Sequence, residues 1–173
     1  MALTTSRNGV LFIACREALV LTAYPDGPHP SIGFGHNSAA LKIGDKIEVA
    51  DAFRLLRDDL AKWEDGVNRA LKAPVSQHKF DALVSLHHQS GNRYMPAVAA
   101  LCNAKEFDVA AALFPLCDRN LAGEQKDGLR KRRILESAVF SAGDYGALDP
   151  IPYWPGDPST TARQQYHLQP GDI

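Results

Sequence analysis

The sequence has no long hydrophobic run. No apolar stretch in its 173 residues approaches the roughly 20 residues that a helix needs to cross a bilayer. The opening residues, Met1-Ala2-Leu3-Thr4-Thr5-Ser6, also lack the charged and then apolar regions of a secretory signal peptide. We therefore expect no membrane span and no recognisable signal peptide, with synthesis and folding in the cytoplasm.

Cysteine is scarce, and neither sign of charge is in excess. The three cysteines, Cys15, Cys102 and Cys117, show no Cys-x-x-Cys spacing, which indicates neither a disulfide framework nor a zinc site. We expect buried thiols, no metal and no cofactor. The 19 basic and 20 acidic residues leave a formal net charge of −1, whereas nucleic-acid-binding domains are usually strongly basic. The balance therefore argues against a nucleic-acid partner.

The composition is that of a globular protein with a sizeable core. Hydrophobic residues make up 45% and charged residues 23%, close to the averages for such domains. The length suits one domain or two small lobes that share a core.

A helical stripe follows Ser6, which is the expected N-cap. Apolar positions and one acidic residue recur at i, i+3, i+4 and i+7, as Val10, Ile13, Ala14 and Glu17. The spacing predicts that Glu17 lies on the apolar face of this helix.

The sequence pattern is no longer helical between residues 19 and 36. Asp26-Gly27 is a turn signal, and three prolines nearby break helices. Ile32 and Phe34 then alternate with glycines, which predicts a small β-hairpin region.

Helical spacing returns after residue 48. A stripe from Ala52 to Ala70 predicts a long helix, and Pro74 ends it. Ser76 can cap the next helix, which should run to Gly91 with His87 on its inward face. Further helices are predicted over residues 96–103, 107–116 and 129–140.

The last segment is rich in proline. Residues 150–173 hold five of the chain's eleven prolines, so the segment cannot begin as a regular helix. Tyr153 and Trp154 would be poorly placed in free solution, and we expect the segment to lie along the body of the protein.

Two carboxylates stand in unlike settings. Glu17 belongs to an apolar helix face, and Asp26 belongs to a polar turn. A desolvated carboxyl can donate a proton while an open one stays ionised, and glycoside hydrolysis needs such a pair. In the alternative interpretation, Glu17 is a salt-bridged helix residue and Asp26 is an ordinary turn former.

The surrounding string carries more information. Glu17-Ala-Leu-Val-Leu-Thr-Ala-Tyr-Pro-Asp26 is followed by Ser31-Ile32-Gly33-Phe34-Gly35-His36. The two strings resemble the phage-type lysozymes, also called glycoside hydrolase family 24 endolysins. Their signature is a Glu, eight residues, an Asp or Cys, and then a Thr-Ile-Gly-x-Gly-His run.

The resemblance extends over about residues 6–145, in the order and spacing of the family. It continues in Gly44-Asp45-Lys46-Ile47, in Phe80-Asp81-Ala82-Leu83-Val84-Ser85, and in Gly128-Leu129-Arg130-Lys131-Arg132-Arg133 with Glu136. Two departures stand out: Ser31 replaces the usual Thr, and the loop of residues 27–30 is one residue shorter than usual.

The resemblance implies an α+β, mainly α, two-lobed lysozyme-like fold with a cleft between the lobes for the glycan strand. A lysozyme domain over residues 1–146 would hold a lobe with a small antiparallel β-sheet at about 18–48, a linking helix at about 49–72, and a helical lobe at about 73–146. Residues 147–173 would form a Pro-rich C-terminal extension.

The resemblance also assigns roles by position. Glu17 looks like the proton donor, Asp26 the second carboxylate, and Ser31 the hydroxyl of a catalytic triad. The expected sugar contacts are Asn37, His88 and Gln89, and Arg130 or Arg133 is expected to pair with Glu17. His36 matches a family histidine that is usually structural. From the sequence itself, His29 is expected to be a solvated loop residue, with a substrate contact as the alternative, and His87 is expected to be packed on its apolar stripe.

The implied activity is cleavage of the β-1,4 bond between N-acetylmuramic acid and N-acetylglucosamine of bacterial peptidoglycan. Such a protein would be a monomer, made in the host cytoplasm, that acts on the cell wall in the periplasm to lyse the host or penetrate its wall. Whether a holin exports it stays open. One alternative is a catalytically silent wall-binding or structural module, and another is a nucleic-acid binder acting through residues 130–133.

Overall fold

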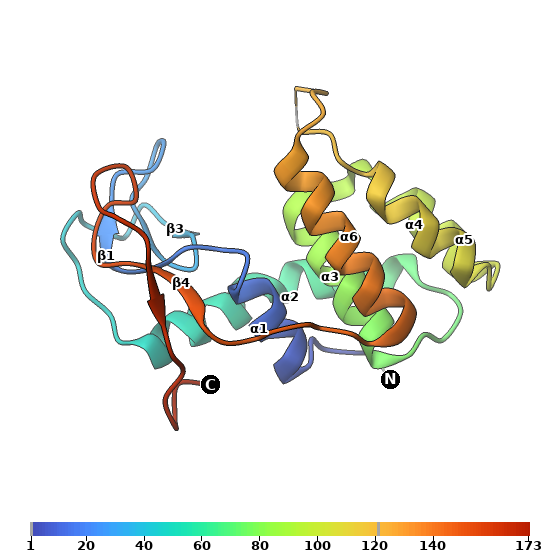
Figure 1. Cartoon of the computed structure of the whole chain (residues 1–173), viewed down its shortest axis with the longest axis horizontal. Coiled ribbons are helices and arrows are strands. Elements are labelled where there is room, and N and C mark those ends of the chain that lie inside the picture. Colours follow the sequence, from blue (N-terminus) through green and yellow to red (C-terminus); the bar gives the residue numbers. More distant parts are fainter. Residues whose placement is uncertain (1, 121) are drawn as a thin grey trace. The chain divides into compact units, whose positions relative to one another are not determined.

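The computed structural model describes residues 2–120 and 122–173, and its fold is the mainly helical α+β class that the sequence predicts (Figure 1). The helices are α1 (Arg7–Ala14), α2 (Val49–Ala70), α3 (Gln77–Ser90), α4 (Met95–Asn103), α5 (Phe107–Leu113) and α6 (Asp127–Ala142), with short 3₁₀ helices η1 (Gly91–Arg93) and η2 (Phe114–Leu116). The strands are β1 (Leu19–Tyr24), β2 (Ser31–Gly33), β3 (His36–Asn37), β4 (Ile151–Trp154) and β5 (Gln164–Tyr166).

The chain divides into two compact units. We call Met1–Gly9 with Leu60–Gly146 the helical unit, and Val10–Asp59 with Ala147–Ile173 the sheet unit. The predicted long helix is α2, and its residues are shared between the two units. The C-terminal residues 147–173 thus cluster with the β-hairpin region.

The sheet has the strand order β3-β2-β1-β4-β5. β1 pairs antiparallel with β2, as the hairpin signal predicts, but it pairs parallel with β4. The N-terminal strands thus form the small antiparallel sheet that was expected, since β2 also pairs antiparallel with β3, and the C-terminal segment adds the parallel strand that makes the sheet mixed. β5 closes the sheet antiparallel to β4. The pairing of β4 with β1 confirms the expectation that the C-terminal segment lies along the body of the protein.

A small apolar core supports the sheet. Ile32 and Phe34 are buried, and the Phe34 ring lies 4.8 Å from the ring of Phe53 on α2. Gly33 takes a positive φ of 67°, and a Cβ there would lie 3.4 Å from the Cβ of Ala52. The glycine therefore suits both the turn and the close approach of α2.

Helix α1 ends earlier than the periodicity predicts. Ser6 caps it as expected, since its Oγ accepts a hydrogen bond from the amide of Gly9 at 3.0 Å. The helix ends at Ala14, and the amide of Glu17 bonds to the Ala14 carbonyl in a tighter turn. Glu17 thus lies in a bend before β1 and not on a helix face.

The helical unit is built around α3 and α6. Its core consists of fully buried apolar side chains from several helices, among them Phe80, Leu83, Val84, Leu86, Val98, Phe114, Val139 and Phe140. The Phe114 and Phe140 rings lie 5.3 Å apart. The helices predicted over residues 96–103, 107–116 and 129–140 are confirmed as α4, α5 with η2, and α6.

A buried carboxylate joins the start of the chain to this core. Asp81 is 1% exposed and accepts hydrogen bonds from the Ser6 amide at 3.0 Å, the Gln77 side chain at 2.9 Å and the Tyr145 hydroxyl at 2.6 Å. Burial raises the pKa of Tyr145, and the bond to Asp81 raises it further, so this hydroxyl stays a donor.

His87 packs inside the helical unit, which confirms its structural assignment. Its Nδ1 lies 3.2 Å from the Trp63 carbonyl oxygen, and its Nε2 lies 3.0 Å from the Asn92 Oδ1. The ring lies against α2 at Gly66, where a Cβ would be only 2.2 Å from His87 Cε1. The glycine makes room for the imidazole.

The close contact between His87 and Gly66 predicts that alanine at position 66 destabilises the protein, although alanine usually favours a helix. Gly66→Ala should destabilise the protein by about 1–3 kcal/mol because the ring must shift, although alanine is the better helix former. Gly128→Ala on α6, where a Cβ would meet no atom within 4 Å, should stabilise it by about 0.4–1 kcal/mol. Urea unfolding of both variants measures the two changes, and a more stable Gly66→Ala variant would contradict the packing argument.

The cysteines are free. Cys102 and Cys117 are buried as expected, and burial raises the pKa of each thiol to about 11, while Cys15 is half-buried. Among residues 2–120 and 122–173, no helix is long and apolar enough to cross a membrane. The same residues contain no group of three or more His, Cys, Asp or Glu side chains that could hold a metal ion.

Candidate active site

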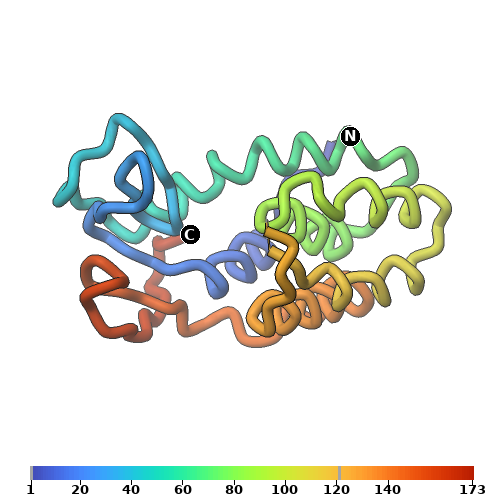
Figure 2. Tube along the Cα trace, turned by 90° about the horizontal axis from the view of Figure 1, so that it is seen from above, coloured from blue at the N-terminus to red at the C-terminus, as the bar shows by residue number. Residues whose placement is uncertain are grey.

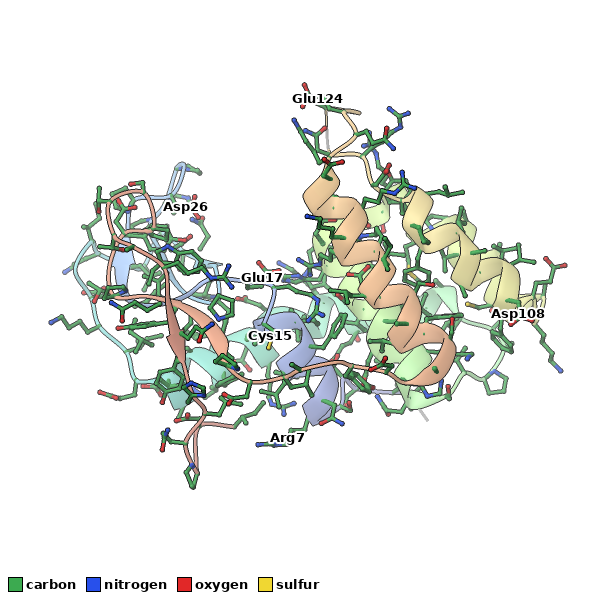
Figure 3. The ribbon with its side chains drawn as sticks, in the orientation of Figure 1. Arg7, Cys15, Glu17, Asp26, Asp108 and Glu124 are labelled. Carbon is green, nitrogen blue, oxygen red and sulfur yellow. The ribbon has the colours of Figure 1, made fainter. Side chains whose placement is uncertain are left out.

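The loop between β1 and β2 brings two of the predicted residues together. Asp26 is exposed in this loop (Figure 3). Ser31 is fully buried at the start of β2. The Ser31 Oγ donates a hydrogen bond to the Asp26 Oδ2 at 2.7 Å. The shortened loop of residues 27–30 therefore keeps the serine hydroxyl on the aspartate, and a positive φ of 67° at Gly27 helps it turn.

Asn37 fixes the same loop from β3. Its Nδ2 donates to the carbonyl oxygens of Asp26 at 3.0 Å and His29 at 2.6 Å, and it lies 3.0 Å from the Ser31 Oγ. An amide has only two N–H groups, so these three contacts share them. The structure thus gives Asn37 a part in positioning Asp26 and Ser31, and its predicted sugar contact stays a prediction.

The predicted proton donor lies in the same unit. Glu17 is half-buried and lies in the bend between α1 and β1 (Figure 3). Burial raises the pKa of the Tyr24 hydroxyl, and the negative charges of Asp26, Asp157 and Glu17 raise it further, in that order. Both predicted carboxylates therefore act on one phenol at the end of β1.

His29 and His36 occupy the settings expected of them. His29 is exposed in the loop. His36 Nδ1 lies 3.0 Å from the Asp59 Oδ2, a contact that ties β3 to α2 within the sheet unit. His36 thus has the structural role that the resemblance implies.

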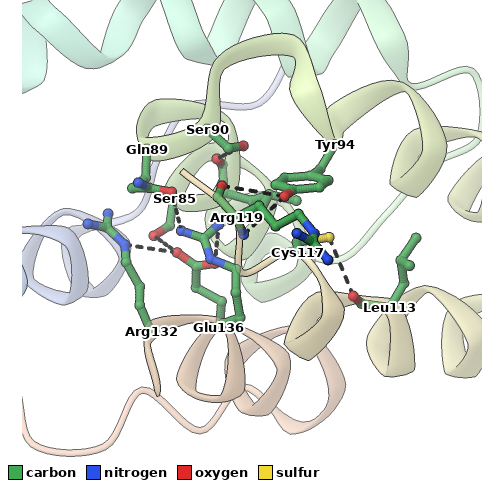
Figure 4. Close-up of polar contacts among 11 residues, drawn as sticks. Ser85, Gln89, Ser90, Tyr94, Leu113, Cys117, Arg119, Arg132 and Glu136 are labelled. Atoms are coloured by element: carbon green, nitrogen blue, oxygen red, sulfur yellow. Dashed lines mark hydrogen bonds and ion pairs between the residues drawn. The ribbon is translucent and has the colours of Figure 1, made fainter. Parts of the chain in front are cut away.

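Arg133 lies inside the helical unit. It is fully buried, its Nη1 is 2.8 Å from the Glu136 Oε2, and its Nη2 donates to the Gln89 Oε1 at 2.8 Å. Glu136 also accepts from Ser85 at 2.6 Å and from Arg132 at 3.1 Å (Figure 4). Burial lowers the pKa of Arg133, and the charge of Glu136 opposes that shift.

This network gives Arg133 a visible role, which is to hold Gln89. Arg130 is exposed on α6. The expected pairing of one of these arginines with Glu17 stays a prediction.

A polar cavity of about 420 Å³ opens beside Gln89. Its lining residues are mostly side chains that can donate or accept hydrogen bonds, namely Gln89, Ser90, Arg93, Arg119, Asn120 and Ala122. Gln89 was predicted from the sequence as a sugar contact, but Arg93 and Arg119 were not, because they come from separate segments with no shared motif. His88 lies edge-on to the Trp63 ring at 6.1 Å.

The sequence also matches a family model. The phage lysozyme model covers residues 14–136, a range that contains Glu17, Asp26, Ser31 and the lining of the polar cavity. The chain belongs to the phage lysozyme family. This membership agrees with the resemblance found in the Glu17-to-His36 strings.

Individual phage endolysins are also similar to this chain in sequence. The endolysin of Bacillus phage PZA is 34% identical in an alignment of length 172, and the match covers 96% of this chain and 64% of that relative. The endolysin of Salmonella phage P22 is 32% identical in an alignment of length 142, and the match covers 78% of this chain and 96% of the relative. The chain thus spans just under two thirds of the Bacillus phage protein.

The fold has close counterparts among solved structures. An endolysin from Escherichia coli O157:H7 phage FAHEc1 matches with a TM-score of 0.77 and 29% sequence identity. The match covers 85% of this chain and 99% of that one.

Proposed function

We propose that the chain is a lysozyme that hydrolyses the β-1,4 bond between N-acetylmuramic acid and N-acetylglucosamine in bacterial peptidoglycan. The observation that carries the proposal is the Ser31–Asp26 hydrogen bond of 2.7 Å in a chain of the phage lysozyme family. Glu17 adds the second carboxyl that glycoside hydrolysis requires, in a more buried setting than Asp26.

Each residue then has a chemical task. Glu17 donates its proton to the glycosidic oxygen as the bond to the anomeric carbon breaks. Asp26, as a carboxylate, either activates a water molecule or forms a bond to the anomeric carbon. Ser31 orients Asp26, and Asn37 holds the loop that carries it.

The sugar contacts complete the proposal. Gln89, held by Arg133 at the wall of the polar cavity, offers an amide that suits the hydroxyl and acetamido groups of a glycan. Asn37 and His88 are the other proposed sugar contacts.

The proposed partner is peptidoglycan, and the biological use is lysis of the host or penetration of its wall. We propose a monomer that is made in the host cytoplasm, acts in the periplasm, and depends on a holin where export is needed.

A turbidity assay on purified cell walls tests the function. The expected result is a loss of turbidity that releases new reducing ends. A catalytically silent wall-binding module would instead sediment with the walls and leave their turbidity unchanged. Binding to labelled DNA that weakens with salt would favour the nucleic-acid alternative.

Ser31 should be a working replacement for threonine. Ser31→Ala should lower the turnover number about tenfold, the equivalent of about 1.4 kcal/mol in the barrier, because Asp26 loses its hydrogen-bond donor. Ser31→Thr keeps the hydroxyl and restricts its rotamer, so its activity should equal or exceed that of wild type. Initial rates on purified peptidoglycan measure both. A wild-type rate in folded Ser31→Ala would remove the hydroxyl from the mechanism.

A further inference from the structure

The C-terminal segment runs beside the candidate active site within the sheet unit. β4 is parallel to β1, with Leu19 opposite Tyr153 and Val20 opposite Trp154. The chain that follows Trp154 therefore continues along β1 toward its carboxyl end, which leads to Asp26. In both views the red loop after β4 lies next to the blue end of β1 (Figures 1 and 2).

This loop contains a preformed turn at residues 157–161. The Asp157 Oδ1 accepts hydrogen bonds from the Ser159 amide at 2.8 Å and the Ser159 hydroxyl at 2.7 Å. The Asp157 carbonyl accepts from the amides of Thr160 at 3.0 Å and Thr161 at 2.9 Å. The side chain and the carbonyl of Asp157 thus both stabilise this turn.

Tyr24 has an acidic neighbour in this turn and another in the loop of Asp26. It ends β1, and its cross-strand partner is Ser31, so the two side chains lie on the same face of the hairpin. Its charge neighbours are Asp26, Asp157 and Glu17.

The Tyr24 hydroxyl is a donor that is available to a ligand. Burial, followed by the three carboxylates, raises its pKa, so the hydroxyl stays protonated. Within the described residues 2–120 and 122–173, it has no hydrogen-bond partner. A half-buried donor of this kind is satisfied by water or by a bound acceptor.

We propose that Tyr24 and the 157–161 turn form a sugar-contact site beside Asp26, in which the Tyr24 hydroxyl donates a hydrogen bond to a hydroxyl or acetamido oxygen of the glycan strand. The acceptor is neutral, because Asp26 and Asp157 would repel an anionic group such as a peptide carboxylate. The 157–161 turn of the C-terminal segment is then part of the substrate site. This inference rests on the proposed lysozyme function.

Steady-state kinetics on soluble peptidoglycan glycan fragments test the contact. Tyr24→Phe should raise KM by about threefold to tenfold and leave kcat unchanged, since a neutral hydrogen bond made equally to substrate and transition state is lost. Tyr166→Phe is the matched control, because it loses a hydroxyl that donates to Asp172 at 3.0 Å in the same sheet, and its KM should stay at the wild-type value.

The turn is tested separately. Asp157→Ala removes the acceptor of the two Ser159 bonds and should raise KM, while Asp157→Asn keeps an acceptor oxygen and should restore the wild-type KM. The dissociation constant of the fragments is also measured with Glu17→Gln protein. Adding Tyr24→Phe to this protein should weaken binding by the same factor by which Tyr24→Phe raises KM.

A wild-type KM in Tyr24→Phe, or an equal rise in Asp157→Asn and Asp157→Ala, would overturn the sugar-contact site. Failure of the wild-type protein to cleave the fragments would instead overturn the lysozyme function, so the two failures are distinguishable.

Discussion

Replacing Glu17 with glutamine should abolish cleavage of purified peptidoglycan and leave the fold unchanged. The amide is nearly isosteric with the carboxyl but cannot give a proton to the glycosidic oxygen. Loss of a general acid costs about 10²–10⁴ in rate, so the residual turnover should fall to the background of the wall assay. Initial rates and the circular dichroism spectrum of the same preparation provide the measurement.

A surface glutamate in the same unit supplies the control. Glu48 is exposed and precedes α2, so Glu48→Gln removes one negative charge without touching the candidate site. Its rate should stay within a factor of two of wild type, a margin of about 0.4 kcal/mol in the barrier. Full activity in Glu17→Gln would remove Glu17 from the mechanism.

Asp26→Asn should reduce turnover about as severely as the change at Glu17. Asparagine keeps a side-chain oxygen that can accept the hydrogen bond from Ser31, so the loop geometry should persist. The variant therefore isolates the negative charge, which both a base and a nucleophile require. Rates on purified peptidoglycan should fall by about 10²–10⁴ with an unchanged melting temperature.

Asp45→Asn is the matched variant for this change. Asp45 is also an exposed loop carboxylate of the sheet unit, and its Oδ2 accepts from the Lys42 amide at 2.8 Å. Its activity should remain at the wild-type level. If Asp26→Asn also kept wild-type activity while His29→Ala lost activity, the loop between β1 and β2 would carry different chemistry from the one proposed.

The helices were predictable because their signals are local. Pro74, Ser76 and Gly91 mark the ends of segments, and α3 begins and stops where they indicate. The hairpin was equally accessible, since Asp26-Gly27 and the glycines around Phe34 require turns.

The setting of Glu17 was not predictable from periodicity. The i, i+7 spacing from Val10 continues through Glu17, and no glycine or proline marks the end of α1. The strand that begins at Leu19 pairs with residues far along the chain, and this pairing competes with further helix. A long-range contact therefore determines the local conformation at Glu17, and a periodic sequence pattern cannot predict such a contact.

The C-terminal strands and Tyr24 show the same limit. Prolines argued against a helix after residue 149, but no feature of Tyr153 or Trp154 identifies β1 as the partner of β4. In the sequence, Tyr24 was only one residue of the family motif. That Asp157 is one of its charge neighbours becomes apparent only once β4 is placed beside β1. Asp26 and Ser31, by contrast, could be named from the sequence because the motif fixes their spacing.

The identity of the new reducing end tests the central claim most directly. Purified peptidoglycan is digested with the wild-type protein, the released fragments are reduced with borohydride, and the reduced sugar is identified by mass spectrometry. The account predicts reduced N-acetylmuramic acid with wild-type protein and none above background with Glu17→Gln. Reduced N-acetylglucosamine as the only new end, or an equal yield of reduced N-acetylmuramic acid from Glu17→Gln, would contradict it.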